Sequence, residues 1–300
     1  MKTKLGKKMK KPSYKRQKAL LALLDTFDGQ LSKTDLQKYM FLYIKEFSES
    51  EHYAFVPYHY GSFSYELYKD LHTLERNGLL SIKENHIETN AKDFFDDIST
   101  DEQRTMTGFS MKYQNLKGSE LIRYVYNKYP YYAIKSKISH RFISSEKLEL
   151  YRPLKSNRAL YTIGYEGKKF ETYLNELIKE DIKVLVDVRK NAHSMKYGFS
   201  KGTLQKAVEN LGIRYIHIPN FGIESENRQT LQTKADYDTL FSKYARTFKT
   251  KVEDMEYLNK LISTEQRIAI TCFENDVSYC HRGVIAKKMK SKFKVEVQHI

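Results

Sequence analysis

The chain has no tryptophan and only two cysteines, Cys272 and Cys280, among its 300 residues. Two thiols this close in sequence cannot build the several cross-links of a disulfide-stabilised secreted domain. No apolar run approaches the roughly 20 residues that a helix needs to cross a bilayer. No apolar signal-peptide segment follows the basic N-terminus either. These absences predict a cytoplasmic protein with no membrane partner.

Acidic residues are absent from residues 1–18, which hold nine lysines and arginines and therefore nine of the +15 formal net charge. Only +6 is left for the rest of the chain, so the excess is concentrated at one end. Such a basic arm attracts phosphate whatever the base sequence, although it also suits a solubilising tail. We expect the arm to bind double- or single-stranded DNA. The residues expected to contact phosphate are Lys7, Lys8, Lys10, Lys11, Lys15 and Arg16.

Residues 19–98 show helical periodicity followed by a short hairpin. Apolar residues recur at helical spacing in three segments, and Ser32 is a typical helix N-cap with Asp35 three residues later. Three helices followed by a hairpin is the order of a winged helix, a variant of the helix-turn-helix. The predicted elements are helices over 13–27, 32–47 and 64–76 and a hairpin over 79–89.

The segment from Tyr53 to Leu67 reads YAFVPYHYGSFSYEL. It resembles the FVPYxYGPFS signature of N-terminal winged-helix modules in some bacterial defence and toxin–antitoxin-related proteins, with Ser62 in place of the usual proline. This resemblance implies an α-rich winged-helix domain over residues 19–98. The same aromatic side chains also suit a core beneath the third helix, so the motif alone does not decide whether the domain binds DNA.

Residues 99–157 predict a helical extension, with a helix over 116–128, and then a polar linker. From 158 to 300, short apolar runs alternate with amphipathic helices. This alternation predicts an α/β domain with a Rossmann-like, mostly parallel sheet and helices on both faces. The expected strands are 160–164, 182–188, 213–218, 267–272 and 295–299, and the expected helices are 170–178, 203–211, 236–248, 252–262 and 282–292.

Polar residues follow the predicted strands directly, where α/β sheets hold their ligand crevice. Glu166 follows the first strand, and Asp187 and Arg189 end the second. Glu274 follows the strand that ends at Cys272, and Cys280-His281-Arg282 opens the next helix. We therefore expect four strand-end segments to converge on one edge of the sheet.

These motifs resemble the family catalogued as domain of unknown function 488, over about residues 159–300. The chain departs from the family pattern at Ile223, where a second glycine is frequent, and at Asn191-Ala192-His193, where a proline is usual. The resemblance implies the α/β fold and a site at these motifs, and it implies no particular activity. The matching motifs are Ile163-Gly164-Tyr165-Glu166-Gly167, Asp187-Val188-Arg189, Ser194 with Phe199, Gly212-Ile213-Arg214-Tyr215, Phe221-Gly222, Cys272-Phe273-Glu274, Cys280-His281-Arg282 and His299-Ile300.

Each polar residue of the site also has a structural interpretation. Asp187 could pair with Arg189, Glu274 could complement a helix dipole, and His281 could bond backbone. Cys272 ends an apolar strand, which favours a buried, inert thiol. Cys280 lies near a helix N-terminus, which would lower its thiol pKa, so a reactive thiol remains an alternative.

Cys272, Cys280 and His281 offer three ligands for zinc, but their spacing is unlike the usual Cys-x(2–4)-Cys pairs and no fourth ligand stands out. Asp187-Val188-Arg189 after a strand suggests rhodanese-like chemistry, yet the cysteine loop lacks the run of backbone donors that such enzymes use. We therefore expect no metal and no cofactor, and favour carboxylate chemistry.

The basic arm, the winged-helix module and the carboxylates suggest an enzyme that cleaves a base–sugar bond in damaged or modified DNA, in repair or phage defence. Such cleavage builds positive charge on the sugar, which a carboxylate can stabilise, and an extruded base can stack on tyrosine. The expected catalytic residues are Asp187, Glu274 and His281. The residues expected to bind substrate are Glu166, Tyr165, Arg189, Ser194, Tyr197, Cys280 and Arg282.

Two alternatives stay open. In the first, Asp187 and Glu274 hold Mg²⁺ in a metal-dependent nuclease. In the second, the protein is a DNA-binding regulator whose α/β domain senses a small anion. The sequence also leaves the oligomeric state open, a homodimer included.

Overall fold

The computed structural model describes residues 10–91, 93–224 and 231–300. The chain divides into two compact units, Met1–Arg152 and Pro153–Ile300. In the described part of the chain, none of the helices has both the length and the apolar character to cross a membrane.

The first unit begins with three helices and a small antiparallel sheet. The side chain of Ser32 accepts a hydrogen bond from the Asp35 backbone N–H at 3.0 Å, which confirms the predicted cap. Strand β5 pairs with both β4 and β1, so the hairpin gains a third strand that the sequence did not predict. The elements are α1 (Lys15–Thr26), β1 (Gln30–Ser32), α2 (Lys33–Glu46), α3 (Tyr65–Arg76), β4 (Leu80–Ile82) and β5 (His86–Thr89).

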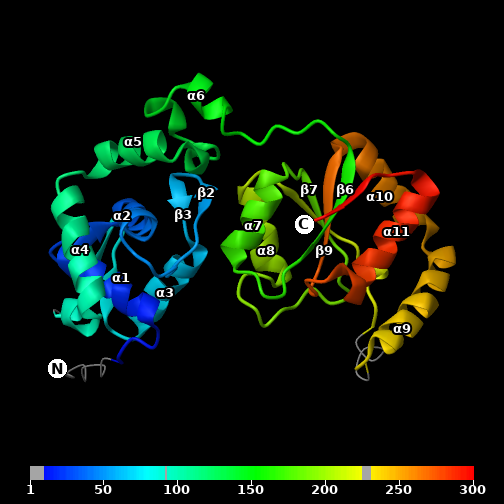
Figure 1. The fold of residues 1–300 in the computed structure, drawn as a ribbon, viewed down its shortest axis with the longest axis horizontal. Coiled ribbons are helices and arrows are strands. Elements are labelled where there is room, and N and C mark those ends of the chain that lie inside the picture. The colour runs from blue at the N-terminus through cyan, green and yellow to red at the C-terminus, as the bar shows by residue number, and fades with distance from the viewer. Residues whose placement is uncertain (1–9, 92, 225–230) are drawn as a thin grey trace, which may run out of the picture. The chain divides into compact units, whose positions relative to one another are not determined.

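A second hairpin and further helices complete this unit (Figure 1). The ring of Phe109 on α4 contacts the rings of Phe27, Tyr39 and Tyr43, so the helices after residue 98 share the core of the helices before it. The sequence patterns did not predict α4. The remaining elements are β2 (Val56–Tyr58), β3 (Gly61–Phe63), α4 (Thr100–Tyr113), α5 (Gly118–Lys128) and α6 (Ser145–Glu149).

The second unit contains a five-stranded sheet in the order β10-β6-β9-β7-β8, and every neighbouring pair is parallel. All residues of β6, β7 and β9 are buried. Their continuous apolar runs follow from this burial, because helices cover both faces of a parallel sheet. The strands are β6 (Ala159–Gly164), β7 (Val184–Asp187), β8 (Arg214–His217), β9 (Arg267–Cys272) and β10 (Val297–His299).

Helices lie on both sides of this sheet, as predicted. In Figure 1, α7 and α8 lie on one side, and α10 and α11 lie on the other. The core on the second side joins strand residues such as Ile268 and Ile270 to Leu258 and Ile285 of the covering helices. The helices are α7 (Phe170–Lys179), α8 (Lys201–Asn210), α9 (Lys234–Arg246), α10 (Val252–Glu265) and α11 (His281–Phe293).

Candidate functional site at the carboxyl edge of the sheet

The register of the parallel strands brings four strand ends together. Gly164 at the end of β6 pairs with Cys272 at the end of β9. Asp187 at the end of β7 lies opposite Thr271 of β9 and opposite His217 of β8. The segments that follow these strands therefore leave the sheet along one edge, as the sequence predicted.

Asp187 is fully buried and forms a bidentate ion pair with Arg189. Its Oδ1 accepts from Nε of Arg189 at 2.9 Å, and its Oδ2 accepts from Nη2 at 2.5 Å. The hydroxyl of Tyr215 also donates to Oδ2 at 2.6 Å. Both carboxylate oxygens are thus occupied, and Asp187 orients Arg189 where the sequence analysis expected a catalytic carboxylate.

The guanidinium of Arg189 ties this pair to the neighbouring loops. Nη1 donates to the Tyr165 hydroxyl and to the Phe199 carbonyl, each at 2.8 Å. Burial by itself would lower the pKa of Arg189, but the hydrogen bonds and charge of Asp187 outweigh burial and raise it. Burial and Asp187 together raise the pKa of Tyr215. Arg189 therefore keeps its charge and braces the strand ends.

Tyr165 is buried and stacks on Phe199, with ring centroids 4.2 Å apart. This ring is already covered on one face, so it is a wall of the site where a stacking platform for an extruded base was expected. Tyr197 and Tyr279 are partly exposed, at 38% each. The ring of Tyr279 packs edge-on against Tyr237.

The loop after β9 is held by backbone contacts. The Phe273 carbonyl accepts from the N–H groups of Tyr165 and Glu166 at 3.0 and 2.8 Å. The Glu166 carboxylate accepts from the Asn275 N–H at 3.0 Å. Glu166 thus orders the loop that carries Glu274.

Arg282 is buried and clamps the same loop from α11. Its Nη1 donates to the Glu274 carbonyl, and its Nη2 donates to the Asn275 carbonyl at 2.7 Å. The sequence predicts that Arg282 binds an anionic substrate. In the structure, its two terminal nitrogens are committed to backbone, so it positions Glu274.

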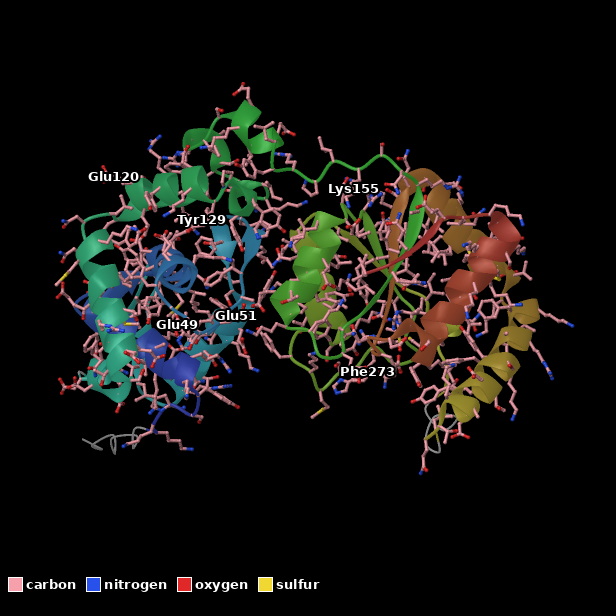
Figure 2. All side chains as sticks on the ribbon, viewed as in Figure 1. Glu49, Glu51, Glu120, Tyr129, Lys155 and Phe273 are labelled. Carbon is pink, nitrogen blue, oxygen red and sulfur yellow. The ribbon has the colours of Figure 1, made fainter. Side chains whose placement is uncertain are left out.

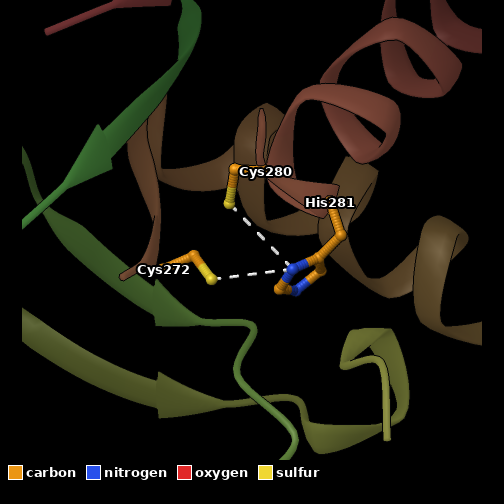
Figure 3. A group of neighbouring side chains, drawn as sticks. All are labelled: Cys272, Cys280 and His281. Carbon is orange, nitrogen blue, oxygen red and sulfur yellow. Dashed lines mark hydrogen bonds between the residues drawn. The ribbon is translucent and has the colours of Figure 1, made fainter. Parts of the chain in front are cut away.

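The two cysteines and His281 converge behind this loop (Figure 3). Nδ1 of His281 lies 3.6 Å from Sγ of Cys272 and 4.0 Å from Sγ of Cys280. Sγ of Cys272 also lies 3.3 Å from a carboxylate oxygen of Glu274. All three residues are about 1% exposed, and burial raises the pKa of the Cys280 thiol. From its place near a helix N-terminus, Cys280 was predicted to have a lowered thiol pKa and to contact substrate, but the effect of burial on its pKa dominates.

A cavity of about 310 Å³ opens beside these groups. Apolar and aromatic side chains form part of its wall. Phe273, which also lines the cavity and is labelled in Figure 2, is 42% exposed. Among the lining residues that the structure describes, three are basic and none is acidic. The lining comprises Tyr165, Arg189, Lys190, Asn191, His193, Ser194, Met195, Ile223, Cys272 and Phe273.

A second cavity of about 440 Å³ shares Lys190, Asn191 and His193 with the first and adds Lys201 and His217. Nearby, Lys196 donates to the Tyr165 carbonyl at 2.6 Å, and burial lowers its pKa against the opposing charge of Glu166. The lysines and histidines that line the two cavities form one basic rim.

The strand-end residues and Ser194 were predicted from the sequence as site residues, whereas Lys190, His193 and Phe273 were not. Their signal was weak, because they lie in a loop or beside a stronger motif. Lys190 also pairs with Glu224 at 2.7 Å.

The residues expected to bind phosphate in the N-terminal arm have different positions. Lys10 and Lys11 are exposed, and Lys15 is exposed in the first turn of α1. Arg16 also lies in α1, and its Nε donates to Asp70 at 2.6 Å. Lys7 and Lys8 lie outside the described residues. Arg16 is therefore part of an ion pair within the unit.

Residues 169–289 match a protein family described as "Domain of unknown function DUF488". The matched segment runs from just before α7 to within α11, and it includes Asp187, Glu274 and both cysteines. Neither a curated protein nor a solved structure matches the chain significantly.

Proposed function

We propose that the protein is an enzyme acting on DNA that releases a damaged or modified base by cleaving its bond to the sugar. The observation that carries this proposal is the cavity at the carboxyl edge of the sheet. A carboxylate, Glu274, stands beside it, basic side chains rim it, and an exposed aromatic ring lies at its mouth. A base extruded from DNA needs such a pocket together with phosphate contacts outside it.

Glu274 is the carboxylate that this geometry favours. Asp187 is saturated by Arg189 and Tyr215, whereas Glu274 is partly exposed on a loop clamped by Arg282. As the base leaves, positive charge grows on the sugar, and a nearby carboxylate stabilises it and orients a water molecule. Phe273 would stack on the base, and Lys190 and His193 would contact flanking phosphates.

The first unit would hold the duplex as a winged helix. Its order α1-β1-α2-β2-β3-α3-β4-β5, with β1 paired to β5, supports this assignment, and the β2-β3 hairpin is an insertion between the second and third helices. In a winged helix the third helix enters the major groove. One face of α3 exposes Tyr68, Lys69, His72 and Arg76, which suits contact with DNA.

The test is to incubate the full chain with duplexes that carry a panel of modified bases and then to treat them with alkali. We expect abasic sites from at least one modified duplex. Glu274→Gln should reduce base release by at least about 100-fold with little change in DNA affinity, because the amide keeps the size but loses the charge. Glu253→Gln, an exposed carboxylate on α10, is the matched control and should retain activity.

Three outcomes would contradict this proposal. The first is no released base across the panel. The second is a Glu274→Gln variant as active as the unmodified chain. The third is strand cleavage without alkali that EDTA abolishes, which would indicate a metal-dependent nuclease.

A further inference from the structure

We infer that Cys272, Cys280 and His281 form a zinc-binding site, although their sequence spacing argued against one. Their three ligand atoms all lie within 4.8 Å of one another, and all three residues are buried. The residues come from the end of β9 and the start of α11, so the fold creates a grouping that the chain order obscures.

The two separations from Nδ1 are close to those around a single tetrahedral ion. Zinc binds sulfur at about 2.3 Å and imidazole nitrogen at about 2.0 Å, which places these two ligand atoms about 3.5 Å apart around the ion. Nδ1 of His281 lies 3.6 Å from Sγ of Cys272 and 4.0 Å from Sγ of Cys280. Figure 3 shows both thiols directed toward the same side of the ring. Small side-chain adjustments would give tetrahedral geometry.

The tautomer of His281 also suits a metal ligand. Nε2 lies 3.0 Å from the Val188 carbonyl oxygen, which can only accept a hydrogen bond. Nε2 therefore carries the proton, and Nδ1 presents its lone pair to the two sulfurs. A backbone carbonyl that fixes the far nitrogen is a typical outer-shell partner of a zinc-bound histidine.

Without a metal, the Cys272 thiol donates to the Glu274 carboxylate at 3.3 Å, and the single lone pair of Nδ1 accepts from one sulfur only. One ion among the three atoms would bind all of them at once. Two thiolates and an imidazole also form a soft donor set that selects zinc over magnesium or calcium.

The three protein ligands leave a fourth position. Cys272 lines the cavity, and its Sγ lies 3.3 Å from Glu274, so this position would border the cavity beside that carboxylate. A zinc site with three protein ligands and an open fourth position is of the catalytic type. We assign the fourth position to water, with Glu274 next to it.

The experiment measures metal on the full chain without substrate, so its result does not depend on the proposed base release. Protein purified from zinc-supplemented cells should contain roughly one zinc per chain. After chelation under reducing conditions, titration with Co²⁺ should produce the near-ultraviolet thiolate-to-cobalt band and the intense visible bands of tetrahedral cobalt. Both should saturate at one equivalent, and zinc should abolish them.

Variants assign the ligands. Cys272→Ser, Cys280→Ser and His281→Ala should each weaken Co²⁺ binding by more than about 100-fold, the upper range for losing an outer-shell partner alone. Glu274→Gln should keep the metal. His140→Gln, an exposed histidine of the first unit, should bind Co²⁺ like the unmodified chain. Circular dichroism checks that each variant is folded. If the variants do not fold, the Co²⁺ titration of the unmodified chain still tests the site.

The inference is overturned if the unmodified chain contains less than about a tenth of an equivalent of zinc and gives no thiolate-to-cobalt band. It is also overturned if folded cysteine variants bind Co²⁺ as tightly as the unmodified chain. Loss of metal in Glu274→Gln would overturn the assignment of water to the fourth position.

Discussion

At the scale of single residues, buried ionisable groups in the described chain are held by an ion pair, by backbone hydrogen bonds or by a shifted pKa. Asp187 and Arg189 form an ion pair at the edge of the sheet. The sequence suggested a catalytic role for these residues, and in the structure the pair supports the neighbouring loops. Among the residues that the structure describes, Lys38 on α2 has no such partner at close range. It is 1% exposed, and its Nζ donates to the Ser62 carbonyl at 3.2 Å. Burial lowers the pKa of Lys38 to about 7, against the weaker opposing effect of Asp35.

This pKa predicts how stability depends on pH. Lys38 has its ordinary pKa of 10.5 when unfolded, so folding expels a proton between about pH 7 and pH 10. The free energy of unfolding should rise with pH across this window, by up to about 1.4 kcal/mol per unit from this group. Lys38→Met removes the group, so its advantage over the unmodified chain should be largest near pH 7 and shrink as pH rises.

Urea unfolding at several pH values from 7 to 9.5 measures this difference. Lys45→Met, which removes an exposed lysine from the same helix, is the control and should show a difference that does not change with pH. A Lys38→Met difference that is equally flat would mean that Lys38 stays charged in the folded protein.

At the scale of elements, the site depends on the loop after β9 lying directly against the end of β6. Gly164 permits this approach, because a Cβ at that position would lie 1.9 Å from the Glu274 carbonyl oxygen. Backbone atoms on both sides cannot move without breaking the Arg282 clamp. The glycine is therefore needed for contact between two loops.

Gly164→Ala should destabilise the protein by about 1–3 kcal/mol and displace Glu274, so base release should fall with it. Gly202→Ala is the matched control, because the added Cβ would have no described atom within 4 Å apart from its chain neighbours and the backbone of its own helix. Position 202 is in α8, where alanine should be neutral or stabilise by up to about 1 kcal/mol. Thermal and urea unfolding would compare the two. If both variants were equally stable, the loop after β9 would not pack closely against the backbone of Gly164.

At the scale of the whole molecule, the proposed DNA contacts of the two units have different roles. The first unit would supply affinity through phosphate contacts, and the second would select the modified base. Lys69 and Arg76 lie on the exposed face of α3, four and eleven residues after its start. Because phosphate contacts release counterions, removing them should reduce the salt dependence of binding.

The double variant Lys69→Ala/Arg76→Ala should weaken DNA binding about equally for modified and unmodified duplexes. The slope of log affinity against log salt should become shallower by about 1 for each phosphate that the variant no longer binds. Lys206→Ala/Lys260→Ala removes two exposed charges from the second unit and serves as the control. Fluorescence anisotropy over a salt series measures both slopes. If the two double variants gave the same slope of log affinity against log salt, the duplex would not contact Lys69 and Arg76 of α3.

The sequence by itself determined the order of the elements in the second unit and the parallel sheet. Continuous apolar strands and amphipathic helices are local patterns, and a parallel sheet covered on both faces is the arrangement that buries them. It also placed Glu166, Asp187, Glu274 and Cys280-His281-Arg282 just after strands. The position of a residue relative to the end of a strand follows from the chain order alone, without knowledge of the tertiary structure.

Only the tertiary structure decided what these groups do. Arg189 and Tyr215 occupy Asp187, the loop after β9 occupies Arg282, and the register of β6 and β9 places the loop that carries Glu274 beside the end of β6. The cysteines were the least predictable part. Their spacing matches no common metal motif, yet the turn from β9 into α11 brings both sulfurs onto one nitrogen of His281. Separation along the chain does not fix separation in space when a loop closes between a strand and a helix.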